Sequence, residues 1–291
     1  MKTPKTIYLF FLPGLFLYSI FFLYPTVSAL FYSFTDWDGL SDTFQFIGTQ
    51  NYERALTGDS VFRKTVGNNM KFMLMVVIFQ TLAALVFALI VLKNTKANLF
   101  LRALYFFPTI LSSVSVAFIW SFIYDPSLGI LNQLLELLGL DFLQQNWLGN
   151  SDIAIYSLAI TQIWFHAGQM LIIFVAGLQA IPEDLYEMAK IEGASKWQTF
   201  SKVTWPLLAP SATIVIAYTT IQSFKAFDLV FAMTGGGPNN STEIIATYIF
   251  DVAFRSYNFG YASSISVLFM IIIAIITFLQ FKALRSDRIS Y

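Results

Sequence analysis

The stretch EMAKIEGASKWQTFSKVTWPLLAP, residues 187–210, places five charged side chains within sixteen residues and ends with two prolines four positions apart. Just before it, Ile181–Asp184 (IPED) is typical of a helix start, because proline suits the first helical position and acidic residues favour the positive end of the helix dipole. Gly193 predicts a break, and apolar residues then recur at helical spacing from Trp197 to Val203. The stretch is therefore predicted to form a helix, a bend and a second helix.

The rest of the chain is far more apolar than this stretch. Of its 291 residues 57% are hydrophobic and 12% are charged, whereas soluble domains carry about 25% charged residues. Several apolar runs approach the length of about 20 residues that a helix needs to cross a bilayer, and they lack the alternation of barrel strands. We therefore expect an all-α polytopic membrane protein with six transmembrane helices. The predicted spans are Ile7–Tyr32, Met70–Leu92, Ala103–Tyr124, Ile153–Leu178, Pro206–Met233 and Tyr261–Phe281.

Lysine and arginine are unevenly distributed over the two sides of these spans. The N-terminal segment, the loops after the second and fourth spans and the C-terminal tail hold eleven of the 17, the opposite loops hold five, and Lys225 lies inside a span. Because cytoplasmic loops carry an excess of Lys and Arg, both termini and the charged stretch are expected in the cytoplasm. The chain has no cysteine, which excludes disulfides, a thiolate nucleophile and sulfur metal ligands.

The charged stretch also carries a small apolar surface. Its members are Met188, Ile191, Ala194, Trp197 and Phe200. One interpretation is a solvated connector; the other is a helix that docks into a groove of a partner protein.

The motif of the stretch is Glu187-Met188-Ala189, then Gly193-Ala194, then Val203-Thr204-Trp205-Pro206. It resembles the EAA loop of the membrane-spanning subunits of binding-protein-dependent ABC importers, with Met188 in place of an alanine and Trp205 in place of the usual leucine. The resemblance implies the type I ABC importer permease fold, with a cytoplasmic coupling helix that docks on an ATPase subunit. The residues it assigns to ATPase coupling are Glu187, Met188, Ala189, Glu192, Gly193 and Ala194.

A second passage, FKAFDLVFAMTGGGPNNSTEIIATYIFDVAF at residues 224–254, resembles the carbohydrate branch of that family, the maltose- and glycerol-phosphate-type sugar permeases. This implies a second homologous permease subunit, two ATP-binding subunits, an extracytoplasmic sugar-binding protein, a sugar substrate and a lipid bilayer, with no nucleic acid. It also implies that ATP and Mg²⁺ bind to the partner ATPase subunits, so that this chain has no cofactor and no enzymatic activity. The implied location is the plasma (inner) membrane of a prokaryote.

Three parts of the chain are predicted. Residues 1–69 form an N-terminal transmembrane helix and external loop, and residues 70–285 form the importer core with a coupling loop at 182–205. Residues 286–291 form a cytoplasmic tail.

Polar side chains inside the fourth and fifth predicted spans are candidate solute contacts, because buried polar groups are costly in a membrane. In register with the maltose-type permeases, the resemblance assigns substrate binding to Phe165, His166, Gln169, Thr219, Gln222, Ser223 and Ala226. Ala226 has no polar group, so one contact of the family is missing here. The alternative is that these residues only hold helices together.

Two further side chains are charged within the fifth predicted span. Lys225 and Asp228 are three positions apart and are predicted to form a structural ion pair; a free Lys225 would instead suit an anionic solute. His166 is the only histidine, and without cysteine it has no second imidazole or thiolate with which to bind zinc, so no metal site is expected.

Other functions fit the sequence less well. There is no G-x-x-x-x-G-K-[ST] loop for ATP and no G-x-S-x-G elbow, so we expect no catalytic residues. An ion-coupled secondary transporter is the main alternative, and it predicts several acidic residues near the middle of the membrane, where this chain offers few beyond Asp228. A channel predicts a repeated filter sequence, which is not evident.

Overall fold

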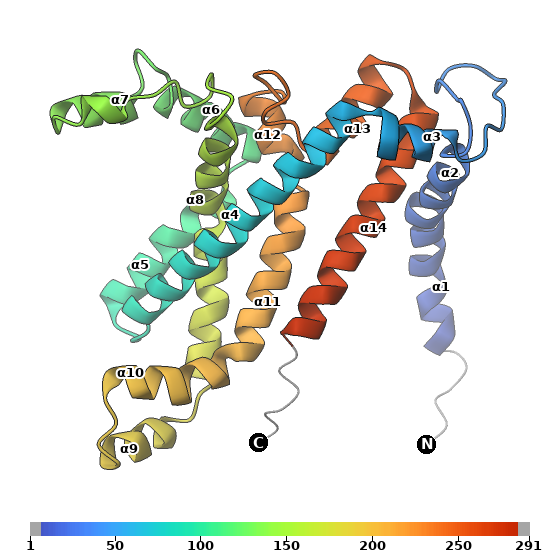
Figure 1. The fold of residues 1–291 in the computed structure, drawn as a ribbon. Helices are drawn as coiled ribbons and strands as arrows, with labels where there is room; N and C mark the ends of the chain where they lie inside the picture. Colours follow the sequence, from blue (N-terminus) through green and yellow to red (C-terminus); the bar gives the residue numbers. More distant parts are fainter. Residues whose placement is uncertain (1–6, 285–291) are drawn as a thin grey trace. The chain divides into compact units, whose positions relative to one another are not determined.

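The computed structural model describes residues 7–284, so Lys2 and Lys5 and the predicted tail 286–291 lie outside the described residues. In the described part, five helical stretches are long and apolar enough to cross a membrane, and a bent pair of helices is a sixth candidate (Figure 1). The five are Phe10–Tyr32, Ser60–Ile90, Ala154–Gln179, Lys196–Phe224 and Phe259–Ala283, and the bent pair is Lys96–Ile110 with Ser113–Ile123. The predicted all-α architecture of a polytopic membrane protein is confirmed.

The chain divides into two compact units. One comprises the residues up to Arg63 together with Tyr248–Ile272, and the other comprises Lys64–Thr247 together with the residues from Ile273 onward. Two long helices, α4 (Ser60–Ile90) and α14 (Phe259–Ala283), contribute to both units.

The core of the second unit lies where α4, α8 (Ala154–Gln179) and α11 (Trp205–Phe224) meet. Fully buried side chains from each helix, among them those of Phe174 and Leu208, form one apolar cluster. Helix α5 (Lys96–Phe106) also packs on α8, and Gly168 makes this possible, because a Cβ there would lie 1.9 Å from the carbonyl oxygen of Tyr105. Small residues at such points let membrane helices approach closely.

The third span is not the single helix that was predicted for Ala103–Tyr124. A 3₁₀ turn at Phe107–Ile110 follows α5, and α6 (Ser113–Ile123) leaves at an angle of 99°. The cause is local, since Pro108 has no amide hydrogen to donate and the two residues after the turn are extended.

The fifth span is also interrupted, so the prediction of one helix over Pro206–Met233 is wrong. Helix α11 ends at Phe224, and a short helix α12 (Phe227–Met233) follows after two non-helical residues. Near the end of α11 the Ser223 hydroxyl donates to the carbonyl oxygen of Thr220 at 2.7 Å. Such local side-chain bonds compete with the helical ladder and are common where helices bend or end.

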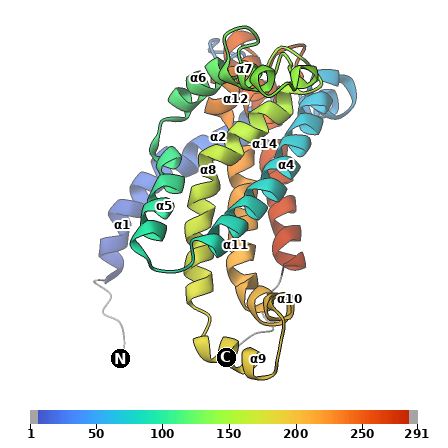
Figure 2. The same ribbon diagram turned by 90° about the vertical axis from the view of Figure 1, so that its left-hand side faces the viewer.

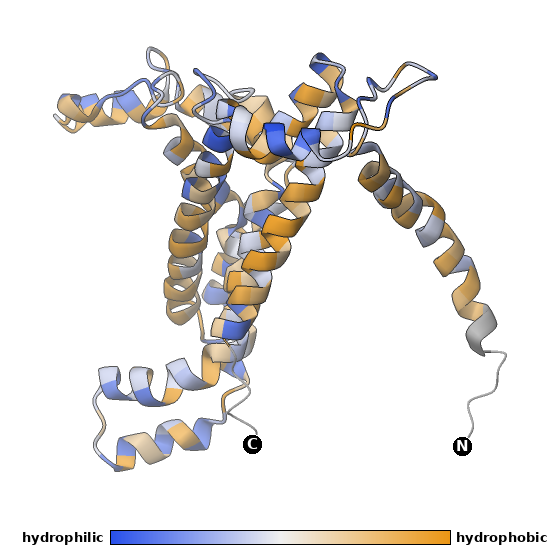
Figure 3. Ribbon diagram, turned by 45° about the vertical axis from the view of Figure 1, so that its right-hand side comes forward, coloured by the Kyte–Doolittle hydropathy of each residue, from blue (hydrophilic) through white to orange (hydrophobic). Residues whose placement is uncertain are grey.

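Between α8 and α11 the charged stretch forms the expected hairpin of two helices, hereafter the coupling hairpin (Glu183–Thr204). Helix α9 (Glu183–Ile191) ends in a Schellman motif: Gly193 has φ +73°, and the Ala194 amide donates to the Ala189 carbonyl oxygen at 2.9 Å. The hairpin is mostly hydrophilic, with isolated apolar positions (Figure 3).

The second arm of the hairpin begins at a reciprocal capping box. The Ser195 hydroxyl accepts from the Gln198 amide, and the Gln198 side chain accepts from the Ser195 amide at 2.8 Å. Helix α10 (Lys196–Thr199) and a π-helical turn at Phe200–Thr204 then lead into α11 without interruption. The C-terminal end of α9 and the N-terminal end of α10 are thus both capped, so hydrogen bonds hold the turn between the two arms on either side.

The first unit carries the first candidate span. Its N-terminal helical elements are α1 (Ile7–Tyr18), a π-helical turn at Ser19–Leu23, α2 (Tyr24–Tyr32), α3 (Gln50–Glu53) and a π-helical turn at Arg54–Gly58. Helix α13 (Ile245–Phe250) and a π-helical turn at Asp251–Arg255 precede α14. Asp59 caps α4 and also accepts hydrogen bonds from the hydroxyls of Tyr248 and Tyr261 at 2.5 and 2.6 Å.

Candidate functional site

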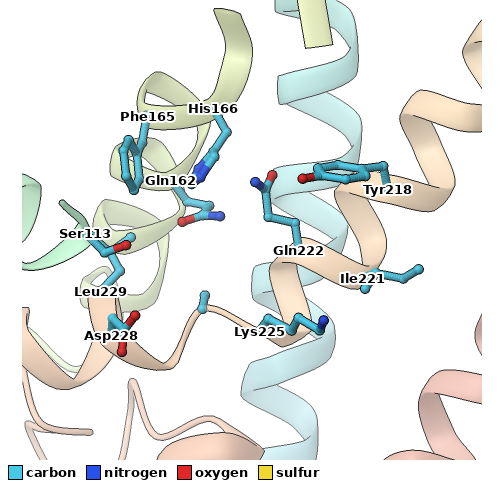
Figure 4. A pocket seen from close by; sticks show the side chains of 11 residues that line it. Ser113, Gln162, Phe165, His166, Tyr218, Ile221, Gln222, Lys225, Asp228 and Leu229 are labelled. Atoms are coloured by element: carbon cyan, nitrogen blue, oxygen red, sulfur yellow. The ribbon is translucent and has the colours of Figure 1, made fainter. Parts of the chain in front are cut away.

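A pocket of about 200 Å³ opens in the second unit where α6, α8, α11 and α12 converge (Figure 4). Its walls combine polar and apolar side chains. The lining residues are Ser113 of α6; Gln162, Phe165 and His166 of α8; Tyr218, Ile221 and Gln222 of α11; Lys225 and Ala226 of the break; and Asp228 and Leu229 of α12.

Hydrogen bonds position the amide side chains of the pocket. The Gln80 side chain, fully buried on α4, donates to the Gln222 side-chain oxygen at 3.4 Å. One turn away on the same face of α11, the Tyr218 hydroxyl accepts from Gln169 of α8 at 3.1 Å. Two polar side chains of the pocket, those of Gln222 and Tyr218, are therefore held by neighbours on α4 and α8.

The ring side of the pocket is built by α8. The rings of Phe165 and His166 lie 4.0 Å apart between centroids, and the Thr109 hydroxyl donates to the Phe165 carbonyl oxygen at 3.0 Å. This last bond joins the bend after α5 to α8, and Ser113 lies just beyond that bend. The interruption of the third span thus brings a hydroxyl to the pocket that a straight helix would not.

Two buried polar atoms near the pocket lack hydrogen-bond partners among residues 7–284. They are Nδ1 of His166 and the side-chain oxygen of Gln80. Buried polar atoms of native proteins are nearly always paired with protein or water. Both atoms are buried in this structure, and Gln80 does not line the pocket.

The structure separates the seven predicted substrate contacts into three groups. Phe165, His166, Gln222 and Ala226 line the pocket. Gln169 lies behind it and bonds Tyr218, whereas Thr219 and Ser223 are fully buried and do not line it. Their contact with a solute stays a prediction.

Sequence reasoning missed Ser113 and Tyr218. Thr219 and Gln222 are three positions apart, a spacing that predicts one helix face. Tyr218 and Gln222 are four positions apart, and this spacing also places two side chains on one helix face. For Ser113 the sequence offered one indication, because Pro108 lies in the turn that precedes α6. Gln162, a further polar residue of the fourth predicted span, belongs to the pocket as well.

The predicted ion pair between Lys225 and Asp228 is not formed. Among the described residues the structure pairs Arg255 with Asp251 at 3.0 Å, and the side chains of Lys225 and Asp228 point away from each other (Figure 4). The reason is the helix break, because Lys225 follows the last residue of α11 and Asp228 lies in the first turn of α12, so the three-residue spacing does not give one helix face. Both charged groups border the pocket instead.

Three of the five residues of the predicted apolar surface are exposed on the coupling hairpin, whereas Ala194 and Phe200 are partly buried. Met188, Ile191 and Trp197 are 57%, 86% and 73% exposed, whereas Ala189 is buried against the second arm. Charged residues, among them Glu187 and Glu192, surround these side chains. In the part of the chain that the structure describes, no three His, Asp or Glu side chains gather as a metal site.

Comparison with known proteins identifies the family. A model of the "Binding-protein-dependent transport system inner membrane component" family matches residues 67–288. The chain belongs to this family. It is 35% identical to the multiple sugar-binding transport system permease MsmF of Streptococcus mutans, over 94% of this chain and 93% of that protein. It is 32% identical to the trehalose/maltose transport system permease MalF of Thermococcus litoralis, over 99% and 96%.

Solved structures agree on the fold. A subunit of a bacterial alginate ABC transporter, crystallised with an alginate-bound periplasmic protein, matches with a TM-score of 0.81 and 19% identity, over 94% of this chain and 92% of that chain. A second structure of an alginate importer gives 0.83 and 20%, over 98% and 96%. The fold is therefore the type I ABC importer permease fold, in a multi-pass inner-membrane protein.

Proposed function

We propose that this chain and a second, homologous permease together form the path by which a sugar enters the cell. Two partner ATPase subunits drive the transport, and an extracytoplasmic binding protein delivers the solute. The printed names of the relatives MsmF and MalF support a sugar as the substrate class. A neutral oligosaccharide fits best, since most polar groups of the pocket are uncharged amides and hydroxyls.

The observation that carries the proposal is that the pocket and the coupling hairpin share two helices. Both α8 and α11 line the pocket; α11 continues the second arm of the hairpin without interruption, and only residues 180–182 separate α8 from α9. Leu185, Tyr186 and Phe200 of the hairpin also pack on the apolar cluster of α4, α8 and α11. A displacement of the hairpin must therefore move the walls of the pocket.

The size of the pocket supports a two-subunit path. Ligand pockets usually measure about 300–1,000 Å³, and this one holds about 200 Å³. A second permease facing it would complete a site large enough for an oligosaccharide. The exposed position of Lys225 and Asp228 at its border leaves both groups available to that partner or to the solute.

The mechanism is alternating access driven from the cytoplasmic side. ATP and Mg²⁺ bind between the partner ATPase subunits, whose closure displaces the coupling hairpin. Helices α8 and α11 tilt with it and turn the pocket outward, and hydrolysis resets them. In this arrangement both termini and the hairpin lie in the cytoplasm, as the distribution of Lys and Arg predicts.

The test is ATP hydrolysis in liposomes by the chain together with the subunits that co-purify with it. The binding protein is added with neutral oligosaccharides, monosaccharides and sugar phosphates in turn. Stimulation by neutral oligosaccharides supports the proposal, and stimulation by sugar phosphates alone would change the substrate class. If no ATPase co-purifies and solute flux follows an ion gradient, the chain is a secondary transporter.

A further inference from the structure

The loop between α6 and α8 presents a row of apolar side chains that nothing in the described chain covers. It contains helix α7 (Ile130–Leu137) and a 3₁₀ turn at Asp141–Leu143. The exposed side chains are Leu128, Ile130, Leu134, Leu137, Leu138 and Phe142, and their exposed fractions range from 47% at Leu134 to 81% at Leu137.

In α7 these side chains gather on one face, hereafter the outer apolar face (Ile130, Leu134, Leu137 and Leu138). Their spacing of four, seven and eight residues gives the apolar side of an amphipathic helix. Glu136 lies on the opposite side. The helix is thus apolar on one face and polar on the other.

Hydrogen bonds hold this loop in place, so the exposed face is a built feature. Asn132 of α7 is only 7% exposed, and its side chain donates to the Gln145 carbonyl oxygen at 3.0 Å and accepts from the Trp147 indole at 2.8 Å. The Ser157 hydroxyl of α8 then donates to the Trp147 carbonyl oxygen at 2.8 Å. The polar side of α7 is fixed to the loop and, through it, to α8.

The position of α7 matches the surface of a bilayer. Figures 1 and 2 both show it beyond the end of α8 that is opposite the coupling hairpin, and in Figure 1 it lies crosswise to that helix. Because α8 crosses the membrane, a helix crosswise at its end lies along the membrane surface. Phe118 and Phe122 of the adjoining α6 are 67% and 63% exposed, so the element that leads to this loop also carries exposed apolar side chains.

The chemistry of the face favours lipid over a protein partner. Its four side chains are aliphatic, whereas protein interfaces concentrate binding energy in Trp, Tyr and Arg. The chain carries no Lys or Arg between Arg102 and Lys190, and the charged groups of the loop are acids such as Glu136 and Asp141. An aliphatic face matches the acyl chains of a leaflet. Because the charged residues of the loop are acidic, burial of apolar side chains, and not attraction to anionic headgroups, would hold the helix at the membrane.

We propose that α7 lies at the membrane–water interface on the external side of the membrane, with its outer apolar face among the acyl chains. Interfacial helices of this kind bury their apolar side about 5–10 Å into the headgroup and acyl boundary. The anchor holds the external end of the α6–α8 connection at the interface while the opposite end moves with the coupling hairpin. This inference does not depend on which solute is carried.

The absence of cysteine permits a direct test with single-cysteine variants of the full chain. Leu137→Cys and its neighbour Glu136→Cys, the matched control on the polar side, are labelled with an environment-sensitive dye. The labelled chain and its co-purifying subunits are reconstituted in vesicles of phosphatidylethanolamine and phosphatidylglycerol, with and without nitroxide-labelled lipid. The dye at position 137 should shift its emission to the blue and be quenched by the labelled lipid, while the dye at 136 should report water.

Three results would overturn the proposal. The dye at 137 could report water as the dye at 136 does, it could be shielded without quenching by the labelled lipid (a protein neighbour), or it could become shielded only when the binding protein is added. A second variant guards against misfolding: Leu134→Gln and Leu137→Gln together should leave co-purification of the other subunits intact. A dye at Leu138→Cys in that background should then lose both its blue shift and its quenching.

Discussion

At the scale of single residues, the pocket depends on which face of α11 turns toward α8. Tyr218 and Gln222 face the cavity, and Thr219 and Ser223 are fully buried outside its lining. The Thr219 hydroxyl has no hydrogen-bond partner in the described part of the chain. Residues one position apart on this helix therefore have different surroundings, although both are polar and both lie in the same span.

This difference predicts that two substitutions on α11 affect solute uptake differently. Gln222→Leu keeps the volume but removes the amide that borders the cavity and bonds Gln80, so it should lower solute uptake at least about tenfold, the loss expected when about 1.4 kcal/mol of polar contact disappears. Thr219→Val removes an unpaired hydroxyl and should leave uptake unchanged. Uptake into proteoliposomes at several solute concentrations measures both, and an equal loss in the two variants would contradict this reading of α11.

At the scale of elements, caps at the two helix ends that it joins fix the turn of the coupling hairpin. Gly193 has positive φ, and no atom lies within 4 Å of the place where its Cβ would stand. A substitution there therefore meets only the cost of the backbone conformation, which is low for Asn and roughly 1–2 kcal/mol for residues that avoid the left-handed region.

Gly193 thus offers a matched pair of variants. Gly193→Asn should keep the Schellman motif and nearly normal coupling. Gly193→Val should strain the turn, misplace the exposed Met188 and Ile191, and abolish solute-stimulated ATP hydrolysis while the chain still inserts in the membrane. Hydrolysis with and without solute is the measurement, and a Val variant that couples as well as the Asn variant would show that the turn geometry is not needed.

A second element with a distinct physical signature is the start of α4. Partial burial would raise the pKa of Asp59, but hydrogen bonds from Tyr248, Tyr261 and the Phe62 amide outweigh it and hold the pKa below its usual value. An acid whose pKa is lowered by folding stabilises the folded state above its unfolded pKa, and that contribution disappears as the pH falls through the folded pKa.

The wild-type chain should therefore lose thermal stability in detergent below about pH 4, the usual range for aspartate. Asp59→Asn should be less stable at neutral pH, because it cannot accept both tyrosine hydroxyls as a carboxylate does, and its thermal midpoint should change less between neutral and acid pH. The exposed Asp42→Asn is the control and should follow the wild type. Parallel curves for all three proteins would mean that the Asp59 cluster does not contribute to stability.

At the scale of the whole molecule, the apolar runs and the hairpin motif were sufficient to predict the spans and the fold, since length and hydropathy report directly on a lipid environment. The two interruptions were not predicted. Pro108 was visible, but a proline can also be accommodated within a spanning helix, and the bond from Thr109 to Phe165 that holds the bend joins residues far apart in the chain. The face of α11 was ambiguous for a similar reason, because helical spacing permits several faces and packing selects one.

The bent pair of α5 and α6 determines the membrane topology of the rest of the chain. Each loop after the pair changes sides according to whether the pair crosses the membrane. If it crosses, Asp42 is external and Lys190, in the hairpin, is cytoplasmic. If it re-enters on the side from which it came, both residues are external and no ATPase can reach the hairpin. In a chain without cysteine, Asp42→Cys and Lys190→Cys can each be probed in intact cells with a membrane-impermeant maleimide. We expect labelling at 42 in intact cells and at 190 only after permeabilisation; labelling of both in intact cells would make the pair re-entrant and remove the basis for coupling to ATP.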